Sequence, residues 1–137
     1  MSEDENHRFI RRFKLKNDDL VTVESLDLFD KQLAKLGLPD SVRNIIELTI
    51  LAGDARAVVV QGTNGIRKIR LALPGENVGK SGGYRVFYLF EKEYKFLFLM
   101  AILSKSEEDN LSKAQRNVLA GLVVRLKAYA KERNPRR

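Results

Sequence analysis

Eight consecutive residues, FLFLMAIL from Phe96 to Leu103, form the longest apolar run in the chain. A helix that crosses a bilayer needs about 20 such residues, so this run is too short to span a membrane. Its length and content predict a buried strand instead. The preceding segment YRVFYLF, residues 84–90, has the same character, and the polar residues 91–94 between them predict a hairpin.

Shorter patterns surround this hairpin. Residues 20–25, LVTVES, alternate as a strand, and AVVVQG and IRKIRLAL are two further strands separated by the turn TNG. Apolar residues at helical spacing predict a first helix ending at Gly37 and a second that begins at Asp40 or Ser41 and ends at Gly53. Ser112 and Gln115 match a capping box before a last helix, whose apolar stripe is expected to be Val118, Leu119, Leu122, Val123 and Leu126.

These elements predict an α+β domain. We expect a small, mostly antiparallel sheet of about four strands, with an N-terminal helical hairpin and a C-terminal helix packed on one side of it. The 137 residues suit one domain. We assign residues 21–131 to it, residues 1–20 to a charged extension that is flexible or adds a strand, and residues 132–137 to a basic tail.

Composition excludes several kinds of chemistry. The chain has no cysteine, and its one histidine, His7, lies in a polar N-terminal stretch that is best interpreted as a solvated tail. A thiolate site or a histidine-based metal site is therefore not expected. The acidic run SEEDN, residues 106–110, precedes a helix, where carboxylates favour the helix dipole rather than a metal ion. The N-terminus lacks a signal-like apolar segment, which predicts a cytoplasmic protein.

Charge points to a polyanionic partner. The formal net charge is +7, which suits RNA, DNA or an acidic protein. The excess is concentrated between Gln61 and Lys105, with eight basic residues against three acidic ones. Side chains of a strand alternate between its two faces, so Lys68 and Arg70 share one face of their strand and Arg67 occupies the other. By the same alternation, Arg85 shares a face with Phe87 and Leu89. Either this face is simply solvated, or it forms a concave basic surface for phosphates.

The loop before the last hairpin favours the second interpretation. The stretch GKSGG, residues 79–83, permits close backbone approach and supplies Lys80 and Ser81. We expect it to bring the following strand close to an RNA backbone, with Arg85 presented toward the phosphates. It is not a P-loop, because the GxxxxGK[ST] spacing is absent.

The segments VVVQGTNGIRKIRLAL, GKSGGYRVFYLF and LFLMAILSKSEEDNLSKAQ together resemble the RelE/ParE superfamily of bacterial toxins, with the HigB-type toxins as the most similar branch. The resemblance runs from about Val21 to Lys127. It implies a compact α+β fold, ribosome-dependent cleavage of messenger RNA, and a cognate antitoxin protein as partner. It also implies no metal and no small-molecule cofactor.

Carried over by position, the resemblance implies that the catalytic residues are Lys68, Arg70, Arg85 and Lys105. Residues with an RNA- or ribosome-binding role would be Arg67, Lys80, Ser81 and Tyr88. The sequence departs from the family pattern in four respects. The segment ILSKS, residues 102–106, lacks the aromatic residue that often comes before the basic position. Arg70 stands where some relatives have lysine, Asn64 replaces a common glycine, and no tyrosine follows Lys105 until Tyr129.

RNA carries its own nucleophile, the 2′-hydroxyl, so a site of fixed cations can stabilise the charge that develops at the phosphate. Two alternatives stay open at this point. One is a ParE-like toxin that acts on DNA gyrase. The other is a basic module that binds RNA or an acidic protein without chemistry.

Overall fold

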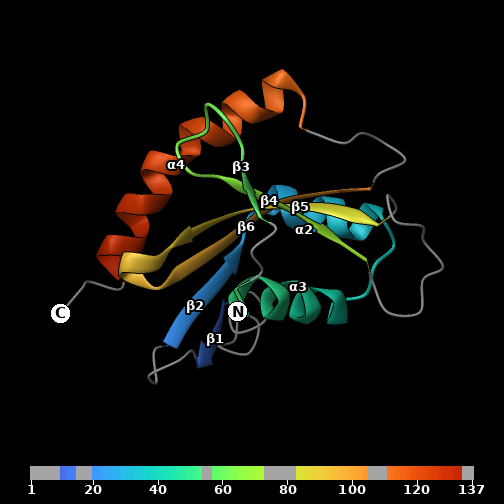
Figure 1. The fold of residues 1–137 in the computed structure, drawn as a ribbon, viewed down its shortest axis with the longest axis horizontal. Helices are drawn as coiled ribbons and strands as arrows, with labels where there is room; N and C mark the ends of the chain where they lie inside the picture. Colours follow the sequence, from blue (N-terminus) through green and yellow to red (C-terminus); the bar gives the residue numbers. More distant parts are fainter. Residues whose placement is uncertain (1–9, 15–19, 54–56, 73–82, 105–110, 134–137) are drawn as a thin grey trace.

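The computed structural model describes residues 10–14, 20–53, 57–72, 83–104 and 111–133, with side chains from Val21 onward. Its helices are α2 (Asp27–Lys35), α3 (Ser41–Leu51), the short 3-10 turn η2 (Lys92–Tyr94) and α4 (Lys113–Arg133). Its strands are β1 (Ile10–Lys14), β2 (Leu20–Ser25), β3 (Val58–Val59), β4 (Arg67–Leu71), β5 (Tyr84–Glu91) and β6 (Phe96–Ser104). The arrangement is α+β, as expected (Figure 1).

The described strands form one six-stranded sheet in the order β1-β2-β6-β5-β4-β3, larger than the sheet of about four strands that we expected. All neighbours are antiparallel except β2 and β6, which run parallel from Thr22 opposite Phe96 to Ser25 opposite Leu99. The apolar strands β5 and β6 lie inside the sheet, joined by the predicted hairpin. Burial on both faces explains why they are apolar almost throughout.

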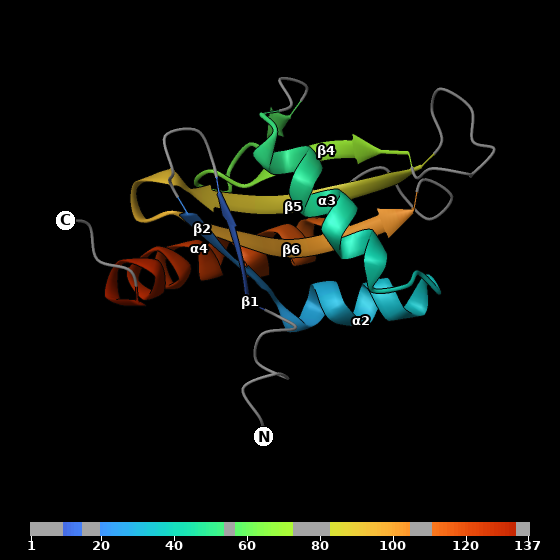
Figure 2. The ribbon, with the colours of Figure 1, turned by 90° about the horizontal axis from the view of Figure 1, so that it is seen from below.

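Helices cover both faces of this sheet, so the expectation that they pack on one side is wrong. Side chains of α2 and α3 join one apolar cluster with Val86, Tyr88 and Leu97. Side chains of α4 join a second cluster with Phe87, Leu89 and Phe98 on the other face. Figure 2 shows α3 on one side of the sheet and α4 on the opposite side. We call these two sides the α2/α3 face and the α4 face.

The phase of β6 changes once along its length. Leu99 and Ile102 belong to the α2/α3 cluster, whereas Met100 and Ala101, between them, both belong to the α4 cluster. The pairing with β5 shifts at the same place, because Phe87 lies opposite Ala101 and Tyr88 opposite Leu99. Met100 is therefore the extra residue of a β-bulge, after which the strand alternates with the opposite phase.

The α2/α3 face contains a partly buried polar network beside its apolar core. Arg43 on α3 donates from Nη2 to Asp30 Oδ1 at 3.0 Å and from Nη1 to Ser25 Oγ at 3.2 Å. Ser25 Oγ donates in turn to Asp30 Oδ1 at 2.7 Å. The guanidinium carbon lies 5.7 Å from the centre of the Phe29 ring. This network joins β2, α2 and α3.

The α4 helix begins with the predicted capping box. Ser112 Oγ accepts from the Gln115 N–H at 3.1 Å, and Gln115 Oε1 accepts from the Ser112 N–H at 3.0 Å. Two N–H groups that have no partner inside the helix are thereby satisfied. The predicted apolar stripe is wrong at Val118, which is 64% exposed, because the buried stripe is Leu119, Val123 and Ala130.

The far end of α4 is held against the sheet by Tyr129. Its ring packs edge-on against Phe96 at 5.6 Å, and its hydroxyl donates to Glu24 Oε2 at 2.8 Å. Burial first, and the bond to the Glu24 carboxylate second, raise the pKa of the Tyr129 hydroxyl above its ordinary value of 10.0. Lys127 adds an ion pair to Glu91 at 3.7 Å. None of the helices in the described residues is long and apolar enough to cross a bilayer.

Candidate nucleic-acid interface

Three predicted site residues lie together on the α4 face. Arg70 on β4 is directly opposite Arg85 on β5, and Lys68 is opposite Phe87, two residues further along the same pair of strands. Phe87 belongs to the α4 cluster, so period two places Lys68, Arg70 and Arg85 on that face. We call these three residues the cation triplet.

Burial differs sharply within the cation triplet. Arg70 is exposed and Lys68 is half-buried, whereas Arg85 is only 1% exposed. Two arginines directly opposite on neighbouring strands repel each other unless a counter-charge is present. The cation triplet thus combines a buried guanidinium with two basic side chains that reach solvent.

The burial of Arg85 conflicts with our expectation that it projects toward RNA. Gly83 is the one residue of the glycine loop that the structure describes, and a contact within the protein explains why it is glycine. Gly83 has φ of 93°, and a Cβ there would overlap the backbone carbonyl of Leu71. Only glycine fits where β5 begins so close to the end of β4. Gly83 therefore serves the contact between two strands of this chain.

The other predicted residues are separated from the triplet. Arg67 is exposed but lies opposite Tyr88, a member of the α2/α3 cluster, so it belongs to the reverse face of β4. Tyr88 itself is only 5% exposed on that reverse face. Lys80, Ser81 and Lys105 lie outside the described residues, as does the acidic run 106–110.

Asn64, which stands where a glycine is common in the RelE/ParE pattern, has a structural explanation. It adopts φ of 62° in the turn between β3 and β4, a left-handed conformation that asparagine tolerates better than most residues. Buried Thr63 closes this turn, donating to the Val60 carbonyl at 2.6 Å and accepting from the Ile66 N–H at 3.2 Å. The turn that leads into Lys68 is thus well defined without glycine at that position.

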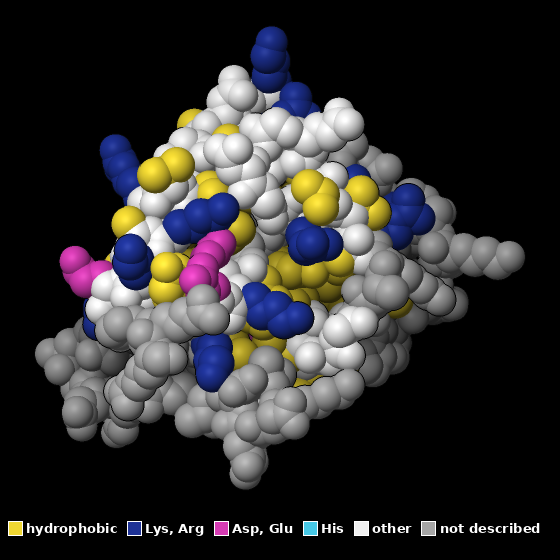
Figure 3. Space-filling view, turned by 60° about the vertical axis from the view of Figure 1, so that its left-hand side comes forward, with side chains coloured by type: hydrophobic (Ala, Val, Ile, Leu, Met, Phe, Trp, Pro, Cys, Tyr) yellow, Lys and Arg dark blue, Asp and Glu magenta, His cyan; other side chains and the backbone are white. Residues whose placement is uncertain are grey.

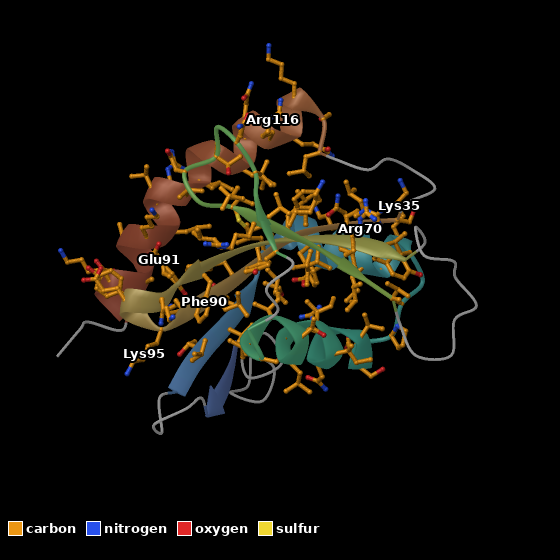
Figure 4. The ribbon with its side chains drawn as sticks, in the orientation of Figure 1. Lys35, Arg70, Phe90, Glu91, Lys95 and Arg116 are labelled. Atoms are coloured by element: carbon orange, nitrogen blue, oxygen red, sulfur yellow. The ribbon has the colours of Figure 1, made fainter. Side chains whose placement is uncertain are left out.

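One face of the molecule is rich in basic side chains. Figure 3 shows many Lys and Arg side chains and few acidic ones, with a hollow floored by hydrophobic side chains near its centre. In Figure 4, Arg70 lies toward the opposite end of the β4–β5 pair from Glu91 and Lys95. Glu91 is therefore not adjacent to Arg70.

The α4 helix supplies a basic residue, Arg116, that was not among the predicted site residues. Arg116 is half-buried and comes three residues before buried Leu119, so it lies on the same side of α4 as Leu119. Its position could have been deduced from the capping box together with the Leu119–Val123 spacing. What the sequence did not reveal is that α4 covers the same face as the triplet.

The arrangement can bind phosphates and stabilise negative charge. Within the described ranges no group of three or more His, Cys, Asp or Glu side chains is arranged to hold a metal ion. Arg70 offers a planar guanidinium that can contact two phosphate oxygens, and Lys68 offers an ammonium group that is capable of proton transfer.

No family model matches the chain. Among solved structures, the fold is similar to a double arginine-to-alanine mutant of the E. coli toxin RelE in the free state, with a TM-score of 0.44 and 16% sequence identity. The similarity covers 74% of this chain and 95% of that one. A likeness this distant adds nothing to the assignment of individual residues.

Proposed function

We propose that the protein is the toxin of a type II toxin–antitoxin system and acts as a ribosome-dependent endoribonuclease on messenger RNA, without a metal ion. The observation that carries this proposal is the cation triplet, with Arg70 and Arg85 in register on neighbouring strands and Lys68 on the same face. The motif resemblance to RelE/ParE toxins supports it independently. The HigB-type branch remains our finer assignment.

In this proposal the 2′-hydroxyl of RNA attacks the adjacent phosphate. The O2′–P bond forms, the P–O5′ bond breaks, and the products are a 2′,3′-cyclic phosphate and a 5′-hydroxyl. The 2′-hydroxyl must lose a proton and the leaving 5′-oxygen must gain one. Extra negative charge develops on the phosphate between these events, and fixed cations stabilise it most effectively when they are already in place.

Each member of the triplet has a distinct proposed role. Arg70, which is exposed, contacts the scissile phosphate. Lys68 is the candidate base for the 2′-hydroxyl, since arginine is a poor base. Buried Arg85 supplies fixed charge from beneath rather than direct contact in this conformation. Lys105, outside the described residues, is the candidate donor to the 5′-oxygen.

A site without a strong base requires the substrate to be aligned by something else. We propose that the ribosome provides this alignment and that the remaining basic surface docks on ribosomal RNA in the cytoplasm. Binding through phosphates should weaken steeply as salt is raised. The antitoxin would then act by covering the basic surface.

The decisive experiment replaces Lys68 with Ala and compares it with Arg67→Ala, the adjacent residue on the reverse face. A defined message is translated in vitro, and primer extension maps the cuts. We expect Lys68→Ala to lower the cleavage rate at least 100-fold, in the range for loss of a general base. Arg67→Ala should cleave within a few-fold of wild type.

Other outcomes distinguish the alternatives. Full activity of Lys68→Ala removes this residue from the mechanism. Tight RNA binding by the wild type with no strand scission on translating ribosomes identifies a non-catalytic binding module. Inhibition of DNA supercoiling by gyrase, with intact messages, identifies a ParE-like activity.

A further inference from the structure

Gln32 on α2 makes an unusual contact with the centre of the sheet. Its side chain is half-buried, and its Oε1 accepts a hydrogen bond from the backbone N–H of Ile102 at 2.8 Å. Ile102 is the first residue after the Met100–Ala101 bulge in β6. A backbone N–H within a sheet needs a partner, and here a side chain supplies it instead of a strand.

The contact continues the pairing that β2 begins. Strand β2 pairs with β6 only as far as Ser25 opposite Leu99. The next residue, Leu26, donates its N–H to the Leu99 carbonyl at 2.9 Å, immediately before the bulge. The Gln32 side chain then accepts from the Ile102 N–H, immediately after the bulge. The chain that leaves β2 and enters α2 therefore holds the bulge from both sides.

The bulge decides which residues of β6 accompany the triplet. Beyond it, Leu103 lies opposite Arg85 and joins the α4 cluster, where it is 6% exposed. A shift of one residue would move Leu103 to the reverse face and place a different residue opposite Arg85. The burial of Arg85 thus depends on the register that the bulge imposes.

We propose that Gln32 is a positioning residue: by accepting from Ile102 it fixes the bulge and thereby the register of β6 beside Arg85. Gln32 does not touch the proposed substrate. It acts on the proposed active site only through the backbone of β6, so the part of this inference that concerns RNA cleavage rests on the proposed function. The part that concerns register does not.

The first test of the proposal is structural and needs no RNA. Gln32→Met keeps the length of the side chain and removes its acceptor, Gln32→Glu restores an acceptor oxygen, and Lys31→Met is a control on the exposed side of α2. By NMR, we expect the Ile102 amide to lose about tenfold in hydrogen-exchange protection in Gln32→Met, as for one lost hydrogen bond. The cross-strand backbone contact between Arg85 and Leu103 should weaken in the same variant. Gln32→Glu and Lys31→Met should retain both signals.

The second test measures cleavage on translating ribosomes by the same variants, at a temperature where all remain folded. We expect Gln32→Met to lower kcat about tenfold with KM within twofold, and Gln32→Glu to recover most of the loss. A Gln32→Met protein with an intact Ile102 signal and Arg85–Leu103 contact overturns the register proposal. Lost NMR signals with unchanged kcat overturn the effect on the active site. If wild type does not cleave, the proposed function fails, and the NMR comparison still decides the register proposal.

Discussion

The two faces of the sheet treat buried charge in opposite ways. On the α2/α3 face, Arg43 is 6% exposed and its guanidinium lies 3.0 Å from the Asp30 carboxylate. On the α4 face, Arg85 is 1% exposed and its cross-strand neighbour is another arginine. The first arrangement pairs opposite charges and joins three elements of the fold. The second concentrates like charges, which is the arrangement expected where an anion is to be bound.

The helices that cover the two faces also differ in how they contact the sheet. Helices α2 and α3 close their face with an apolar cluster around Phe29, Leu33 and Ile46. Helix α4 is anchored through Tyr129 to Phe96 and Phe98, at the end of β6 opposite to Leu103. The triplet lies on the part of the α4 face remote from that anchor. Stability should therefore respond most to changes on the α2/α3 face, and RNA binding to changes on the α4 face.

The largest expected effect on stability comes from Asp30→Ala. The change removes the carboxylate that accepts from both Arg43 and Ser25. Breaking a fully buried ion pair costs about 3–5 kcal/mol. We expect Asp30→Ala to lower the free energy of unfolding by about 2 kcal/mol, since the Asp30 side chain is 27% exposed. Urea unfolding measures the loss. Asp27→Ala, an exposed acid in the same helical turn, should cost less than about 1 kcal/mol, and equal losses would contradict a special role for the network.

A smaller effect, on RNA affinity alone, is expected from Arg70→Gln. One lost phosphate contact should weaken binding of single-stranded RNA about fivefold and reduce the slope of log K against log salt by about 0.7. Fluorescence anisotropy across a series of KCl concentrations measures both. Arg67→Gln, on the reverse face of the same strand, should leave the slope unchanged. If both variants change it equally, the distinction between the two faces does not hold for RNA.

The smallest effect is expected from Tyr129→Phe, which tests the anchor of α4. Loss of the bond to Glu24 should cost about 1 kcal/mol at neutral pH. Because folding raises the Tyr129 pKa, the native state holds this proton more tightly than the unfolded chain does. The stabilisation is therefore complete below pH 10 and declines as pH rises through the native pKa. Urea unfolding between pH 7 and 11 should show the advantage of wild type over the variant shrinking at high pH; a constant difference would rule this out.

Much of this protein could be predicted from short-range patterns. The apolar runs of β5 and β6, the alternation of β4 and the Ser112–Gln115 capping box depend on residues close together in the sequence, where side-chain period and backbone hydrogen bonding leave few choices. The same alternation was enough to assign Lys68 and Arg70 to one face of their strand and Arg67 to the other. These features follow from local stereochemistry and needed no knowledge of the fold.

Other features were decided only by tertiary structure. The sequence by itself could not show that α4 covers the face opposite α2 and α3. Alternation along a strand separates two faces but does not indicate which helix packs on each. Nor could it show that Arg85 is buried, or that Gln32 accepts from Ile102 across the fold. The bulge in β6 reverses the strand's phase through pairing with distant residues. Burial and register depend on contacts between segments far apart in the chain, and no local pattern encodes them.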